Sequence, residues 1–174
     1  YITNTFTGTD LDDADSIAGR ATLLFKPQDN LEIVVRADAS RDRTNSGATE
    51  VLDNGDFTGA PFADADPTDR MVAMNLDTIQ DRDIFGASLE LNWSFDMGTL
   101  TSISAYREFD WYNFADNDFS VLNMLASGIT EDQHQYSQEV RFASPSGTRF
   151  EYVVGAYYYY QTLDTIASAL IGPD

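Results

Sequence analysis

The sequence predicts an all-β protein, an antiparallel meander of about six long strands with short turns at one end and long acidic loops at the other. Three observations support this fold class. Apolar side chains recur at every second position over segments of roughly 11 to 14 residues, which is the period of a strand. Short turns rich in Pro, Gly and Asn join these segments in pairs. The pairs are separated by long stretches that hold most of the acidic side chains.

The strands are expected at residues 16–26, 31–43, 83–95, 99–112, 133–144 and 149–162, all within one barrel segment spanning residues 1–174. The alternation is clearest in 83–95, where Phe85, Leu89 and Trp93 share a face, and less clean in 99–112 and 133–144. For residues 99–112 the alternation predicts an outward face made of Ile103, Ala105, Arg107, Phe109 and Trp111.

Turn chemistry joins the strands into three hairpins. The connections at 27–30, 96–98 and 145–148 each contain the Pro, Gly or Asn that a tight turn requires. A helical turn is weakly signalled at 121–126 and at 164–170. The resulting order is strand, short turn, strand and long loop, repeated along the chain.

Charge is distributed unevenly over the 174 residues, of which 29 are acidic and 10 basic, for a net charge of −19. Most of the acidic excess lies in residues 1–15, 44–81 and 113–132. Nucleic acid is excluded as a partner, because phosphate binding needs Lys and Arg. A disordered acidic tail is excluded by the 43% hydrophobic content. The absence of cysteine excludes a disulfide framework and a thiolate metal site.

Strand length and the placement of aromatic residues favour a transmembrane β-barrel. A tilted membrane-spanning strand needs about 9–11 residues, whereas soluble strands usually have about 5–6. Aromatic residues gather at both ends of the apolar faces, as in the two interfacial girdles of such barrels. Near the short turns these are Phe25, Trp93, Phe95, Phe142, Phe150 and Tyr152, and toward the loops Phe85, Phe109, Trp111, Tyr136, Tyr158 and Tyr160.

Polar residues on the same faces count against a lipid-facing surface. They are Arg107, His134 and Gln138. Arg107 is expected close to the outer interface, where a lipid-facing Arg costs about 0–1 kcal/mol.

Four segments resemble the barrel strands of TonB-dependent receptors. They are residues 15–27 (DSIAGRATLLFKP), 98–107 (GTLTSISAYR), 138–145 (QEVRFASP) and 150–158 (FEYVVGAYY). Their order and spacing are similar to those of consecutive middle strands, and the resemblance covers nearly the whole chain. The plug, the TonB-contacting box and the terminal barrel strand of that family are not found among the 174 residues.

The resemblance implies a barrel of about 22 strands in the outer membrane of a Gram-negative cell, with its long loops extracellular. It implies active uptake of a siderophore, a glycan or a similar nutrient. The implied partners are outer-membrane lipid, an unidentified nutrient ligand and the TonB complex, the last through parts of the receptor outside this sequence.

No catalytic or cofactor-binding residue is expected. His134 is the only imidazole, and alternation places Ser137 on the opposite strand face, out of its reach. Weak metal candidates are Asp10, Asp12, Asp53 and Asp56, whose carboxylates suit Ca²⁺. They do not match the twelve-residue calcium loop, so solvated acidic loops are the favoured interpretation.

Two further sets of residues concern the inward face. Tyr157–Tyr160 is split by alternation, with Tyr158 and Tyr160 outward and the other two inward. A girdle with lumen packing is therefore the favoured interpretation, and a stacking platform for a sugar or an aromatic ligand is the alternative. The inward charged residues have both signs, as expected of a polar lumen with cross-strand ion pairs. They are Arg20, Arg36, Glu90, Glu139, Arg141 and Glu151.

Two alternatives to a receptor barrel remain open. Six strands leave two unpaired sheet edges, which favours self-association. The chain is then an extracellular self-assembling β-rich structural protein, or a fibre subunit derived from such a barrel. The weaker alternative is a soluble β-sandwich that acts as a binding module.

Overall fold

The computed structural model describes residues 1–45, 47–49 and 69–172, and in these it is all-β. Six long strands form one sheet, and three short strands form a second one. The long strands are β3 (Asp15–Gln28), β4 (Leu31–Thr44), β6 (Ile79–Phe95), β7 (Gly98–Asp116), β8 (Leu125–Ala143) and β9 (Val153–Ile171). The short strands are β1 (Ile2–Asn4), β2 (Asp10–Leu11) and β5 (Met71–Val72).

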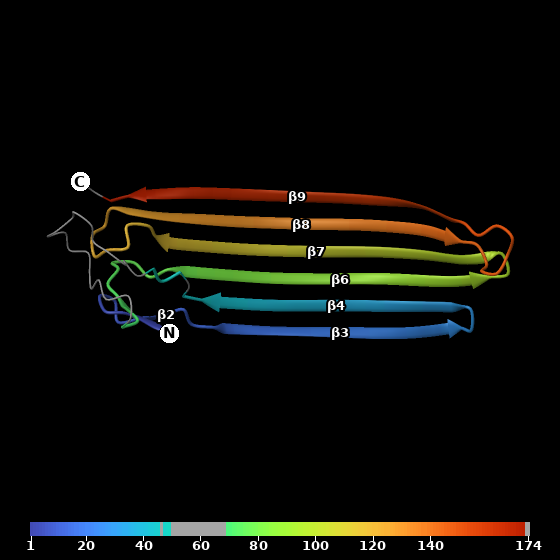
Figure 1. The fold of residues 1–174 in the computed structure, drawn as a ribbon, viewed down its shortest axis with the longest axis horizontal. Coiled ribbons are helices and arrows are strands. Elements are labelled where there is room, and N and C mark those ends of the chain that lie inside the picture. The colour runs from blue at the N-terminus through green and yellow to red at the C-terminus, as the bar shows by residue number, and fades with distance from the viewer. Residues whose placement is uncertain (46, 50–68, 173–174) are drawn as a thin grey trace.

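The large sheet is an antiparallel meander in the order β3-β4-β6-β7-β8-β9. Figure 1 shows the short turns gathered at one end of the sheet and the longer connections, with both termini, at the other. The predicted antiparallel meander is therefore confirmed. Most of the strands extend several residues further toward the loop end than the sequence indicates, because pairing continues there. Asn113, for example, still pairs with Gln80 on one side and with Ile129 on the other.

The helical turns considered at 121–126 and 164–170 are wrong. Residues 164–170 continue β9, where Asp164 pairs with Asp132 and Leu170 with Ala126. The ladder with β8 supplies inter-strand hydrogen bonds along this whole segment, and this pairing overrides the weak helical signal. The last strand also begins at Val153 instead of residue 149, after a loop that Tyr152 closes by a backbone bond to Ser144.

Gly98 shows why one short turn needs its residue type. Its φ is +143°, and a Cβ there would lie 2.2 Å from the carbonyl oxygen of Ala143. Only glycine avoids this collision, so the β6–β7 turn can pass directly beside the end of β8.

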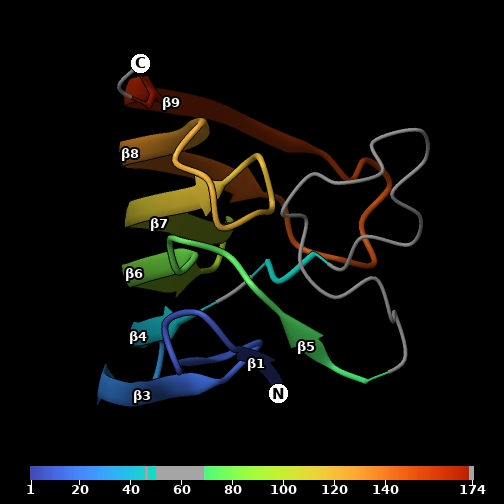
Figure 2. The same ribbon diagram turned by 90° about the vertical axis from the view of Figure 1, so that its left-hand side faces the viewer.

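The buried core lies at the loop end and not under the large sheet. Leu11, Val72 and Met74 are buried there, and Ile2 and Phe119 pack against them. The short strands hold this cluster, with β1 between β2 and β5. Figure 2 shows β1 and β5 on one side of the large sheet.

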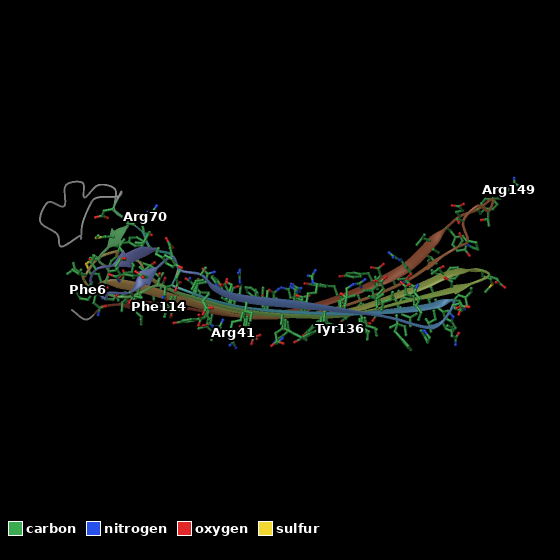
Figure 3. The ribbon with its side chains drawn as sticks, turned by 90° about the horizontal axis from the view of Figure 1, so that it is seen from below. Phe6, Arg41, Arg70, Phe114, Tyr136 and Arg149 are labelled. Carbon is green, nitrogen blue, oxygen red and sulfur yellow. The ribbon has the colours of Figure 1, made fainter. Side chains whose placement is uncertain are left out.

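Both faces of the large sheet are open in the part of the chain that the structure describes. Every described residue of β3 and nearly every one of β9 is exposed, and each of these strands has only one long neighbour. The sheet is bowed, and Arg41 and Tyr136 project from its convex side, opposite Arg70 (Figure 3). Among the described residues there is no helix long and apolar enough to cross a membrane.

Candidate functional site

The strand register assigns each side chain of the large sheet to one of two faces, because directly opposed residues share a face. Val35 pairs with Leu89, Leu89 with Ser104, Ser104 with Gln138, and Gln138 with Tyr158. The face of these residues is the one that carries Arg41 and Tyr136, and we call it the convex face. We call the other side the polar face.

An apolar band covers the convex face. Large side chains in it are freely exposed, such as Leu23 at 64% and Val154 at 61%. Aromatic rings border the band at the turn end, where Trp93 lies 4.6 Å from Phe95 between ring centroids. The rings at the other border come from four neighbouring strands and are Phe85, Tyr106, Tyr136, Tyr158 and Tyr160.

A single row of charged residues ends the band toward the loops. Arg41 pairs with Asp83, Asp83 with Asp110, Asp110 with Asp132, and Asp132 with Asp164. The row therefore crosses five strands at one level. When the convex face is followed from the turn end toward the loops, the first acidic or basic side chain of β4, β6 and β9 lies in this row. In β7 and β8 it lies one row closer to the turns.

The predicted outward face of β7 is wrong. Arg107 pairs with Gly86, and Phe109 and Trp111 pair with Ile84 and Arg82, so all of these lie on the polar face. Tyr106 takes the expected place of Phe109 among the rings. The two sides of β7 are similarly mixed in polarity, and only the pairing with β6 distinguishes them.

The two polar residues of β8 do lie on the convex face, and each is satisfied there. Gln138 accepts a hydrogen bond from Ser104 at 2.5 Å and donates one to Ser102 at 3.0 Å. His134 lies one row below the charged row, with Nδ1 2.9 Å from the Tyr106 hydroxyl and Nε2 2.9 Å from Asp132. These contacts offset the cost of placing an amide and an imidazole among apolar side chains.

The polar face carries cross-strand ion pairs along its whole length. The guanidinium of Arg36 lies 2.8 Å from Glu90, Lys26 lies 2.8 Å from Glu32, and Arg82 lies 2.8 Å from Asp42. The predicted inward residues Arg20, Glu139 and Arg141 are on this face as well, with Arg141 3.3 Å from Glu139. Glu151 lies outside the strands and accepts a hydrogen bond from the Gly147 amide at 2.6 Å.

Two of the hollows on the large sheet lie on its opposite faces. One of about 460 Å³ opens on the convex face between Ile17, Phe85 and Asp110. The other, of about 230 Å³, lies on the polar face beside Arg36, Arg107 and Tyr159. The second hollow is the smaller one, and both are lined by side chains that can form several hydrogen bonds at once.

The loop end is organised by one buried amide. Asn4 is fully buried, and its Nδ2 donates 2.9 Å hydrogen bonds to the Met74 carbonyl and to Asp77. Its Oδ1 accepts from the backbone amides of Phe6 and Met74, both at 3.1 Å. One side chain thereby joins β1 to the chain that leads from β5 into β6.

Asp116 at the end of β7 and Asp118 in the loop that follows have opposite pKa shifts. Burial, together with the nearby charge of Asp118, raises the pKa of Asp116, whose Oδ2 is buried without a hydrogen bond to the described residues. Burial also acts to raise the pKa of Asp118. Hydrogen bonds from Ser120, Leu125 and Met124 outweigh it, so the pKa of Asp118 is lowered.

The structure describes two of the four metal candidates. Asp10 accepts a hydrogen bond from Thr3 at 3.1 Å, and Asp12 donates its amide to the Asn45 carbonyl at 2.6 Å. Asp53 and Asp56 lie outside the described residues. Within residues 1–45, 47–49 and 69–172, no three His, Cys, Asp or Glu side chains are arranged to hold a metal ion.

His134 and Ser137 lie on opposite faces of β8, as alternation requires. The sheet therefore presents two surfaces of different chemistry, one apolar with a charged border and one polar with ion pairs. Comparison with protein-family models, with curated proteins and with solved structures finds no match for the chain.

Proposed function

We propose that the chain forms part of an outer-membrane β-barrel of a Gram-negative cell, with the convex face against lipid and the polar face lining the lumen. The charged row from Arg41 to Asp164 is the observation that carries this proposal. A water-exposed face has no reason to begin its charges at one level in neighbouring strands, whereas a bilayer surface imposes such a level.

The height of the apolar band supports the same orientation. On β6, Trp93 and Asp83 mark its two ends. Ten residues at about 3.4 Å each make about 34 Å of strand, and a tilt of about 45° reduces this to about 24 Å. The apolar band of outer-membrane barrels is about 25 Å tall. The loop end, with the short strands and the buried cluster, is then extracellular.

For the activity, we propose active nutrient uptake by a TonB-dependent receptor, with a siderophore, a glycan or a similar compound as the ligand. The support for this step is the resemblance of four segments to receptor barrel strands, together with the length of the strands. Barrels of this class have at least eight strands, so further strands must complete the wall beside β3 and β9.

Adjacent cysteines on β6 test the orientation, because the chain has no cysteine of its own. Ala87→Cys places a thiol on the convex face, and Ser88→Cys places one on the polar face of the same strand. A nitroxide spin label at each site, in outer membranes of cells that make the full natural chain, reports collisions with oxygen and with a water-soluble nickel chelate. We expect oxygen to dominate at position 87 and nickel at position 88.

Equal access of the nickel chelate to both positions contradicts a lipid-facing convex face. Dependence of nutrient uptake through the protein on the proton gradient and on TonB then tests the receptor activity separately. The spin-label test can therefore fail while the uptake test succeeds, and the reverse, so the two parts of the proposal are tested separately.

The unpaired edges of β3 and β9 favour a second candidate, a structural protein that assembles with copies of itself. It predicts large particles that stay in solution without detergent. A chain that can be extracted from membranes only with detergent contradicts it.

A further inference from the structure

Small residues of three neighbouring strands leave a hollow of about 230 Å³ on the polar face. The register places Ser88 of β6, Ala105 of β7 and Ser137 of β8 side by side, because Ser88 pairs with Ala105 and Ala105 with Ser137. This row ends on a large side chain at either side, Arg36 on β4 and Tyr159 on β9. The three small residues form the floor of a slot between them.

The charges around the slot are paired. Arg36 binds Glu90 at 2.8 Å, and Arg107 binds Asp38 at 3.1 Å. An anion would compete with the carboxylates for these guanidiniums, and a cation would compete with the guanidiniums for the carboxylates. A neutral ligand meets neither cost, and it can still hydrogen-bond to the outer atoms of both pairs.

Several polar groups at the slot are without a hydrogen-bond partner in the described part of the chain. The side chains of Ser88, Gln135 and Ser137 make no hydrogen bond to another described residue. Two hydroxyls and one amide are therefore available as donors and acceptors. An apolar ligand would leave these groups unsatisfied, and this excludes it as the preferred occupant.

Tyr159 adds an aromatic surface at the β9 side of the slot. Its hydroxyl donates to Gln161 at 2.5 Å, which fixes the ring, and the residue is 47% exposed. Aromatic side chains combine an apolar face with a polar tip, which matches a sugar ring with its apolar C–H face and hydroxyl rim. The volume is below the roughly 300–1,000 Å³ of pockets for drug-sized ligands, so the slot suits a small part of an oligosaccharide, with the remaining rings outside it.

We infer that this slot binds a neutral carbohydrate, with Tyr159 stacking on one ring and Ser88, Ser137, Gln135 and the paired guanidiniums bonding to its hydroxyls. The inference narrows the ligand of the proposed receptor to a glycan, and it rests on that proposed function only for its role in uptake. Binding itself requires only the polar face described above.

Titration calorimetry on the full natural chain in detergent micelles tests the inference. The probes are maltotriose, xylotriose and N,N′-diacetylchitobiose, with citrate as an anionic comparison. We expect at least one of the sugars to bind and citrate not to bind. Tyr159→Ala should weaken sugar binding about tenfold, the upper end of what one aromatic contact contributes. Ala105→Leu, which fills the floor, should abolish it.

Two variants on the convex face serve as matched controls. Tyr158→Ala and Ala87→Leu make equivalent changes on the other side of the sheet and should leave the sugar affinity unchanged. Far-ultraviolet circular dichroism checks that each variant keeps its strands, and Tyr159→Ala still decides the matter if Ala105→Leu does not fold.

The inference is overturned if none of the three sugars binds, if citrate binds more tightly than they do, or if variants on the two faces change the affinity alike. Failure of the proposed membrane orientation would show in the spin-label comparison at Ala87 and Ser88. A positive result in the sugar titration would remain valid in that case.

Discussion

The guanidinium of Arg107 on β7 reaches over β6 to the carboxylate of Asp38 on β4, with 3.1 Å between Nη2 and Oδ2. The residue between them is Gly86, which pairs with both. A Cβ at Gly86 would lie 3.0 Å from Arg107 Nη2 and 3.2 Å from Asp38 Oδ1. The missing side chain is therefore what lets an ion pair form between strands that are not neighbours.

We expect Gly86→Val to uncouple this pair. Asp38→Asn should cost up to about 1 kcal/mol of unfolding free energy in the natural sequence, as exposed ion pairs do, and much less when position 86 is Val. Urea denaturation of the four proteins of this double-mutant cycle measures the difference. An equal cost of Asp38→Asn in both backgrounds would show that the contact contributes nothing.

The loop end should respond to pH through Asp116. Because its pKa is raised above 3.8 in the folded chain, the folded state holds the proton more tightly than the unfolded one. Its contribution to stability is present below the unfolded pKa and is lost as pH rises through the folded pKa. Asp116→Asn should therefore increase loop protection at pH 7, measured by hydrogen exchange of the 116–125 amides, and should flatten the pH dependence.

Asp118 should behave in the opposite way. Its lowered pKa means that it stabilises the loop above the unfolded value of 3.8, and that this stability is lost as pH falls through the folded pKa. Asp118→Asn should reduce protection of the Met124 and Leu125 amides at pH 7, because both donate to its Oδ2. The same hydrogen-exchange series is the measurement, and equal effects of the two substitutions would contradict the opposite shifts.

Asn4→Ala should loosen the contact between β1 and the chain that leads from β5 to β6. The substitution leaves the buried Met74 amide and carbonyl without side-chain partners, which costs about 2–3 kcal/mol locally. Exchange rates of the 72–77 amides report the loss. Thr7→Val is the control, since it removes only exposed hydrogen bonds, one to Asp77 and one from the Thr9 amide, and should cost no more than about 1 kcal/mol.

Charge on β3 should be tolerated on one face only, if the convex face meets lipid as proposed. Ala21 lies on the convex face in the row of Ala37 and Ala87, and Thr22 lies on the polar face beside it. Ala21→Arg should lower barrel stability by about 2–4 kcal/mol, and Thr22→Arg should have little effect. Urea titration of the heat-modifiable band from outer membranes compares the two, and similar costs would argue against a bilayer on the convex side.

Much of the architecture follows from local patterns. The period of two in residues 83–95 and the Gly at position 98 allowed β6 and the tight turn after it to be placed to within a few residues. The segment 164–170 shows the limit, because its few helix-favouring residues lose to a ladder that only β8 supplies. Gly86, in the middle of a strand, was the one local signal of a close approach at that point, and it does not name the residues that meet there.

The sequence by itself determined that the chain forms long alternating strands, with near-neutral faces between acidic loops, since these depend on the order of residues along one strand. Tertiary structure alone decided which side of β7 joins the convex face, that the charges of five strands share one level, and that Ser88, Ala105 and Ser137 meet beneath Tyr159. The reason is that a shift of one residue in register exchanges the two faces of a strand. Register is set by the pairing of whole strands, which no single segment contains.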